Sequence, residues 1–88
     1  MKINGDFIKR EIAGDIILVP VGETAIRFNG MLTVTESGSV IWDDLLAGKS
    51  KAEIIDHLLS IYETEREILE KDYDEFIAAL EKNDLIKR

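Results

Sequence analysis

The stretch 29–42 changes from the periodicity of a strand to that of a helix, with a single capping residue between the two. Asn29 and Gly30 form a turn pair that tolerates positive φ, and the run Met31–Val34 after them has the alternating, β-branched character of a strand. The side chain of Thr35 can then accept a hydrogen bond from the free amides of a helix start. The segment therefore predicts a short strand joined directly to a helix.

The chain has 88 residues and no cysteine. This length allows one domain, residues 1–88, and the lack of cysteine excludes disulfides, thiolate nucleophiles and metal sites held by thiolates. Charged residues begin near the start of the chain, and the longest apolar run, Ile16 to Val19, is too short to cross a membrane. We therefore expect a soluble, cytoplasmic protein with no membrane partner, stabilised by core packing alone.

Two strands are predicted before this stretch. The segments Phe7–Ile12 and Asp15–Val21 flank the break at Ala13 and Gly14, which is typical of a hairpin with a tight turn. The segment 22–29 has the weakest periodicity, and its sequence allows either a short helical turn or an irregular crossing. The first half of the chain therefore predicts a small antiparallel sheet of three strands.

Three helices are predicted after the third strand. The first runs from Glu36 to Leu46 and ends before Gly48, which can adopt the left-handed conformation of a helix terminus. Capping boxes begin the next two helices, at Ser50 and Thr64, and the second helix ends at Tyr62. The third helix ends near residue 83 and repeats apolar residues along one stripe: Leu69, Tyr73, Phe76 and Leu80. The fold class is therefore α+β and winged helix-turn-helix-like, a three-stranded antiparallel sheet followed by three helices.

Winged helix-turn-helix proteins include transcriptional regulators whose third helix enters the DNA major groove, and this is the alternative function. The charge of the chain opposes it. The formal net charge is −7 at pH 7, and acidic residues outnumber basic ones along the third helix. Binding to a phosphate backbone depends on clustered Lys and Arg, so we expect no nucleic acid partner.

The side chains that suggest chemistry have simpler structural explanations. Trp42 lies on the apolar face of the first helix and is predicted to be core, whereas His57 is the only histidine, is expected to be solvent-exposed, and lacks the partners of a metal or general-base site. The carboxylate pairs Asp43–Asp44 and Asp72–Glu75 are typical of a solvated helix face. We therefore predict no catalytic residue, no metal, no cofactor and no enzyme activity; a small enzyme, the third option, would need a bound metal or cofactor.

The order and spacing of several short motifs resemble the PqqD-like family over nearly the whole chain. They are the Arg10-Glu11-Ile12 and Leu18-Val19-Pro20 strand segments, Phe28-Asn29-Gly30-Met31, the passage from Thr35 to Trp42, Tyr62, Asp72, Phe76-Ile77 and Leu80. Two positions depart from the family: Thr35 stands where asparagine is usual, and Asp84 where glycine is frequent before the final apolar pair. These departures affect the predicted helix boundaries rather than the surface between the third strand and the third helix.

This resemblance implies a RiPP recognition element, a peptide chaperone that binds the leader of a ribosomally made precursor peptide and presents it to a modifying enzyme, often a radical SAM protein. In the family the leader lies as an added strand on the third strand, with side chains in the groove beside the third helix. An exposed strand edge can also join two copies, so a homodimer is a further possibility. The partners implied are therefore a leader peptide and a modifying enzyme.

The helical period leaves two flanks of the third helix open as the groove wall. Ile68, Asp72, Glu75 and Ala79 lie on one flank, and Tyr73 and Ile77 lie on the other. We favour the first flank, because the small Ala79 lets a peptide approach closely, and Asp72 borders the apolar stripe. The predicted peptide-binding residues are Met31, Leu32, Thr33, Val34, Ile68, Asp72, Glu75, Phe76 and Ala79.

Overall fold

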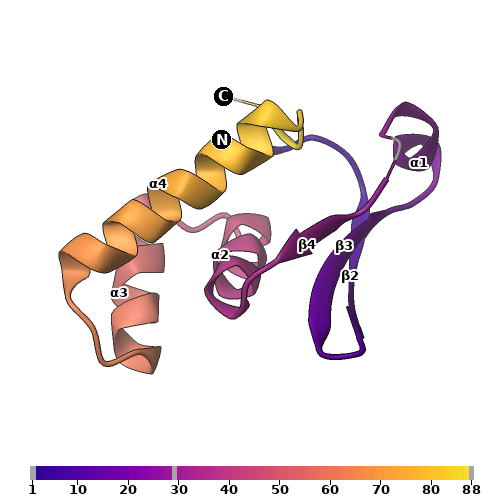
Figure 1. The fold of residues 1–88 in the computed structure, drawn as a ribbon. Coiled ribbons are helices and arrows are strands. Elements are labelled where there is room, and N and C mark those ends of the chain that lie inside the picture. Colours follow the sequence, from indigo (N-terminus) through magenta and orange to yellow (C-terminus); the bar gives the residue numbers. More distant parts are fainter. Residues whose placement is uncertain (1, 29, 88) are drawn as a thin grey trace.

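The computed structural model describes residues 2–28 and 30–87. Figure 1 shows the arrangement, with α2, α3 and α4 on one side of β4 and the hairpin of β2 and β3 on the other. In chain order the elements are β1 Lys2–Ile3, β2 Phe7–Ile12, β3 Asp15–Pro20, α1 Glu23–Arg27, β4 Leu32–Val34, α2 Glu36–Leu46, α3 Lys51–Ile61, α4 Arg66–Lys82 and β5 Ile86–Lys87. The predicted α+β plan of a three-stranded antiparallel sheet and three main helices is present.

The hairpin of β2 and β3 turns at Ala13 and Gly14, as predicted. Both residues have positive φ, 53° and 87°, which is the conformation that a two-residue type I′ turn requires. In such a hairpin the residues that flank the turn, here Ile12 and Asp15, form a hydrogen-bonded pair. The turn therefore sets the register of β2 against β3.

From this pair outward, the backbone groups of β3 alternate between its two neighbours. Asp15, Ile17 and Val19 direct their N–H and C=O groups toward β2, and the residues between them direct theirs toward β4. A hydrogen bond of 3.0 Å from the Val21 amide to the Asp6 carbonyl continues the same alternation beyond the strands. The strand order is β2-β3-β4, so β4 lies at an edge of this sheet.

A second sheet, of β1 and β5, was not predicted. It pairs Lys2 with Lys87 and Ile3 with Ile86, and the Asn4 amide extends the pairing with a hydrogen bond of 2.6 Å to the Leu85 carbonyl. Residues 85 and 86, which the sequence predicts only as an apolar tail, are buried. The final segment therefore packs into the core beside the first residues of the chain.

The segment that the sequence left open contains the short helix α1. Thr24 in this helix is buried, and its Oγ1 accepts a hydrogen bond of 2.8 Å from the Asp6 amide. Asn29 of the predicted turn pair lies outside the described residues, whereas Gly30 has the positive φ, 137°, that a turn there needs. This connection brings the chain from β3 back to the edge strand.

The helix starts follow the predicted caps in two of three cases. Thr35 Oγ1 accepts from the Gly38 amide at 3.0 Å, and Ser50 and Glu53 form a complete capping box. The third predicted box is wrong, because α4 begins at Arg66 with Glu65 at the N-cap position and no side-chain cap. Thr64 instead belongs to the turn after α3, where its amide donates to the Tyr62 carbonyl.

The core lies between the sheet and the helices. Trp42 is 1% exposed, which confirms its predicted structural role, and the ring of Phe7 packs edge-on against it with centroids 5.5 Å apart. Leu18 of the sheet and Leu58 and Leu80 of the helices are fully buried in the same cluster. The edge strand and α4 are thus held on a shared core.

Asp44 and His57, both predicted to be exposed to solvent, are instead paired with each other. Asp44 is 5% exposed rather than solvated, and its carboxylate lies 2.6 Å from His57 Nδ1 and 3.4 Å from Lys49 Nζ. His57 is therefore half-buried between α2 and α3 instead of free in solvent, whereas Asp43 is exposed as predicted. A buried carboxylate needs such partners, which explains the difference.

Candidate functional site

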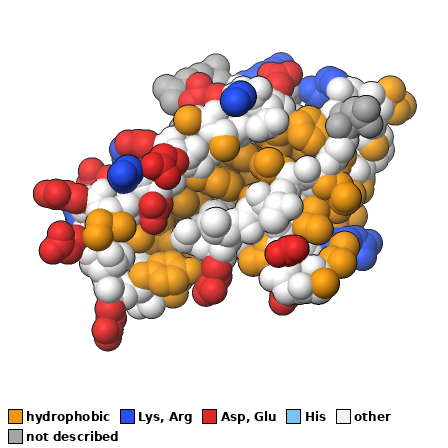
Figure 2. Space-filling view, viewed as in Figure 1, with side chains coloured by type: hydrophobic (Ala, Val, Ile, Leu, Met, Phe, Trp, Pro, Cys, Tyr) orange, Lys and Arg blue, Asp and Glu red, His pale blue; other side chains and the backbone are white. Residues whose placement is uncertain are grey.

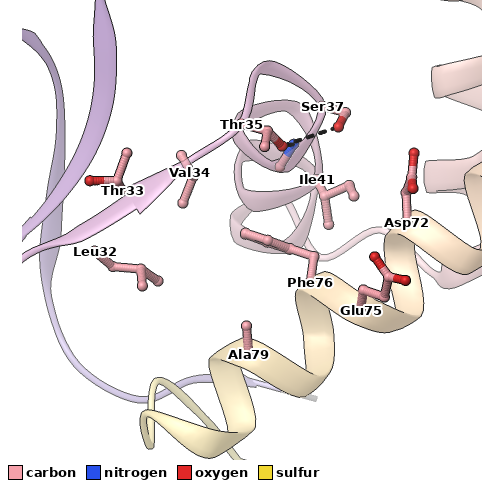
Figure 3. A pocket seen from close by; sticks show the side chains of 11 residues that line it. Leu32, Thr33, Val34, Thr35, Ser37, Ile41, Asp72, Glu75, Phe76 and Ala79 are labelled. Carbon is pink, nitrogen blue, oxygen red and sulfur yellow. Dashed lines mark hydrogen bonds between the residues drawn. The ribbon is translucent and has the colours of Figure 1, made fainter.

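A groove of about 320 Å³ lies between the edge strand β4 and the helix α4. Figure 3 shows the side chains of both elements converging on it, with the first turn of α2 closing one end. Its lining residues are Leu32, Thr33, Val34, Thr35, Ser37, Gly38, Ile41, Asp72, Glu75, Phe76 and Ala79. The groove therefore combines a strand edge with a helix face.

The open edge of β4 presents the backbone groups of Thr33. Val34 pairs with Ile16 and Leu32 pairs with Leu18, and the alternation along β3 makes both of these hydrogen-bonded pairs. The residue between them, Thr33, consequently directs its N–H and C=O away from β3, toward the groove side. Among the described residues, β4 has no strand partner other than β3.

The floor of the groove is apolar and closely packed. Phe76 is half-buried and packs against the core cluster, Ile41 is a buried member of that cluster, and both line the groove. Gly38 in α2 allows the Phe76 ring to approach, because a Cβ at this position would lie 3.1 Å from its Cε1 atom. Because residue 38 has no side chain, the Phe76 ring can lie close to α2 and the groove above it stays deep.

The α4 side of the groove is acidic. Asp72 and Glu75 are both exposed along it, and none of the described lining residues is basic. Figure 2 shows apolar side chains gathered in the hollow between α4 and β4, with acidic side chains along the helix. A ligand in the groove therefore meets backbone hydrogen-bonding groups on one side, apolar surface below and negative charge on the other.

Most of the residues predicted for the peptide site lie together around this groove. Leu32, Thr33 and Val34 line it from the strand, and the α4 residues that line it are Asp72, Glu75, Phe76 and Ala79. The flank of α4 with Ala79 faces β4, whereas Tyr73 and Ile77 on the other flank are buried. Their role in binding a peptide stays a prediction.

Two predicted site residues lie outside the groove. Met31 precedes β4 and is 64% exposed. Ile68 lines a neighbouring hollow nearer the start of α4. Conversely, Ser37, Gly38 and Ile41 line the groove but were not predicted for it. A glycine in the first turn of a helix is a signal of close approach that sequence reasoning could have used for Gly38.

Tyr62 stands beside the groove, after the end of α3. Its hydroxyl donates a hydrogen bond of 3.3 Å to Glu36 Oε1. Burial raises the pKa of the Tyr62 hydroxyl, and the negative charge and hydrogen bond of Glu36 raise it further. The phenol therefore stays protonated at neutral pH and can act as a hydrogen-bond donor to α2.

Chemistry-bearing groups are sparse in the part of the chain that the structure describes. No three His, Cys, Asp or Glu side chains there are arranged to hold a metal ion. No helix of the described residues is both long and apolar enough to cross a bilayer.

Comparison with known proteins agrees with this geometry. The family model described as coenzyme PQQ synthesis protein D (PqqD) matches residues 15–86. A solved structure described as TbiB1 in complex with the TbiA(beta) leader peptide superposes with a TM-score of 0.76 at 26% identity, covering 99% of this chain and 95% of that one. No curated protein matches the chain. Because the family model spans most of the sequence, from β3 to β5, the protein belongs to the PqqD family, and its resemblance to a RiPP recognition element is confirmed.

Proposed function

We propose that this protein binds the leader segment of a ribosomally made precursor peptide and presents it to a modifying enzyme. The leader adds to the open edge of β4 as a further strand, and its side chains enter the groove beside α4. The single observation that carries the proposal is the position of Thr33, whose free backbone N–H and C=O face the groove over an apolar floor. Strand addition to such an edge is a common mode of peptide recognition.

The groove divides the work of recognition between two surfaces. Backbone hydrogen bonds along β4 supply affinity for any extended peptide, because they do not depend on the peptide sequence. Selection then comes from the floor around Phe76, which accepts apolar side chains at alternate positions, and from Asp72 and Glu75, which favour basic residues at the rim. A leader with apolar residues two apart and a nearby Lys or Arg fits this pattern.

The modifying enzyme, such as a radical SAM protein, performs the chemistry in this proposal. By holding the leader, the domain raises the concentration of the precursor at the enzyme to about the millimolar range for a short flexible connection. This role needs no catalytic group in the chain itself. The family and the complex of the similar protein TbiB1 with a leader peptide support it.

A second copy of the chain offers another strand for the same edge. A homodimer joined through β4 would occupy the groove side of Thr33 and compete with the leader. The size of the protein in solution, measured by light scattering with and without leader, tests this: leader should convert any such dimer into a monomeric complex. Binding of DNA is not favoured, since the α4 face beside the groove carries Asp72 and Glu75.

The proposal is tested by titrating a labelled synthetic leader, taken from the precursor gene nearest to this one, into the protein. We expect saturable binding that Thr33→Pro abolishes, because proline removes the free amide while leaving both hydrogen-bonded pairs of β4 with β3 in place. Thr33→Val is the matched control, since it keeps the amide and the β-branched shape. Absence of binding to every neighbouring precursor, or undiminished binding by a folded Thr33→Pro variant, refutes the proposal.

A further inference from the structure

A second hollow of about 330 Å³ adjoins the groove at the end where β4 passes into α2. The two hollows share Ser37 and Asp72 in their linings, so they form one continuous surface along α4. The second hollow lies nearer the start of α4 and is bounded on its far side by the turn after α3. Nothing in the strand-addition model uses this part of the surface, because it lies beyond the last residue of β4.

Three of the residues that line the second hollow, Tyr62, Ile68 and Leu69, supply apolar surface. Ile68 is 52% exposed although it is a large aliphatic side chain, and Leu69 beside it is buried and closes the base. The Tyr62 ring adds apolar surface to the same hollow, and its hydroxyl donates a hydrogen bond of 3.3 Å to Glu36. An exposed isoleucine together with a buried leucine and an aromatic ring offers an apolar contact for a side chain from outside the protein.

The charge around the second hollow matches that of the groove. Glu63 and Asp72 line it, and none of its described lining residues is basic. A peptide that suits the acidic rim of the groove therefore suits this hollow as well. The shared residues and the shared charge together indicate one ligand for both hollows rather than two different ligands.

The direction of β4 determines which part of that ligand reaches the second hollow. The strand runs from Leu32 to Val34 and then, through Thr35, into the first turn of α2, where Ser37 borders both hollows. A peptide paired with β4 that continues in an extended form past Val34 advances about 3.3 Å per residue. It therefore enters the second hollow within a few residues of leaving the strand.

We propose that the second hollow is a separate anchoring site for the leader peptide, and that it accepts one large aliphatic or aromatic side chain from the flank that leaves the added strand at the Thr35 end of β4. This inference rests on the proposed function of the groove. It assigns specificity to a leader residue that makes no backbone pairing with the sheet. It also makes Ile68, which lies outside the groove, a contact residue for the leader peptide.

The test is a double-mutant cycle with the synthetic leader and its single-alanine variants. Ile68→Ala should weaken binding of the full leader roughly five- to thirtyfold, the loss expected for three apolar carbons on a half-exposed side chain. One apolar leader position outside the added strand should lose affinity for the wild-type protein when changed to alanine, and lose little more with Ile68→Ala. Leu46→Ala is the matched control, because Leu46 is 60% exposed and lines neither hollow.

The outcomes separate this inference from the proposed function. If the leader binds the wild type and Ile68→Ala binds it as tightly as Leu46→Ala does, the second anchoring site is refuted and strand addition stands. A loss with no coupled leader position assigns Ile68 a structural role and also refutes the site. If no leader binds the wild type at all, both proposals fail together. Circular dichroism of each variant confirms that it is folded before binding is measured.

Discussion

Gly38 in the first turn of α2 lies directly against the Phe76 ring in α4, and a Cβ added to it would be 3.1 Å from the ring atom Cε1. This distance is shorter than ordinary van der Waals contact, and Thr35 Oγ1 lies equally close to the added Cβ, so a side chain at residue 38 pushes on both the ring and the capping hydroxyl. Phe76 is half-buried and borders the groove, which leaves the groove as the space into which it can move. The depth of the groove therefore depends on a glycine in a different helix.

We predict that Gly38→Ala weakens leader binding without unfolding the protein. Alanine is favoured over glycine within a helix by about 1 kcal/mol, which offsets part of the strain from the displaced ring. The melting temperature should change little, while the dissociation constant for the leader rises. Phe76→Leu removes part of the groove floor but also relieves the contact, so Gly38→Ala should cost less affinity in the Phe76→Leu background than in the wild type. An equal cost in both backgrounds would contradict this account.

Hydrogen exchange of the β4 amides should distinguish the two edges of the strand. The Thr33 amide has no sheet partner and should exchange quickly in the free protein, whereas the amides of Leu32 and Val34 bond to β3 and should be protected. With leader at about a hundred times its dissociation constant, exchange at Thr33 should slow by roughly a hundredfold. NMR measures all three amides in one sample, and a Thr33 amide that stays unprotected in the complex would rule out strand addition at this edge.

The acidic wall should act mainly on the rate of association. Replacing Asp72 and Glu75 together with Asn and Gln removes the two charged groups of the groove lining. We expect roughly threefold slower association with a basic leader at low salt, and a weaker dependence of this rate on salt. Stopped-flow measurements at two salt concentrations provide the readout. Glu67→Gln, also on α4 but outside the groove, should leave the rate nearly unchanged.

The buried Asp44 should be essential for packing α2 against α3 and irrelevant to the groove. Its carboxylate lies 2.6 Å from His57 Nδ1, and loss of that partner leaves a buried charge with Lys49 alone. His57→Leu should therefore destabilise the fold by about 1–3 kcal/mol in urea unfolding, with leader affinity unchanged. His57→Gln keeps a donor in reach and should recover part of the loss; equal losses for both variants would assign the effect to packing.

The capping box of α3 predicts a stability difference that depends on pH. Hydrogen bonds with the Ser50 backbone and then with its side chain lower the pKa of Glu53 below its ordinary value. A carboxyl whose pKa is lower in the folded state stabilises the fold above its unfolded pKa, and this stabilisation is lost as the pH falls through the folded value. The melting temperature of Glu53→Gln should therefore lie below that of the wild type at pH 7, with the gap closing toward pH 3. Glu11→Gln on the exposed hairpin should show no such trend.

Much of the local structure could be predicted from the sequence, because short-range signals determine it. The hairpin follows from Ala13 and Gly14, and the starts of α2 and α3 follow from Thr35 and Ser50. The start of α4 is wrong in the prediction, because Thr64 lies in the turn after α3 and the helix begins after Glu65 without a side-chain cap. The short helix α1 has too few residues for its periodicity to be recognised.

The contacts between distant residues could not be predicted. The pairing of Ile3 with Ile86 joins two strands of two residues, which have no measurable alternation, and the pairing of Asp44 with His57 depends on how two helices pack. For the same reason, the sequence could not establish which flank of α4 lines the groove. The helical period placed Ala79 on one flank of α4 and Ile77 on the other, but only the packing of α4 against α2 and β4 decides which flank is open.

The pairing of β1 with β5 brings Lys2 beside Lys87. A circular permutant is therefore feasible: a short linker would join residue 87 to residue 2, and new ends would open in the exposed turn between α2 and α3. Neither change touches β4 or the lining of the groove. The same closeness means that a flexible tether attached at either end would leave the surface from nearly the same point, so the groove would lie about equally far from the attachment point whichever end carries the tether.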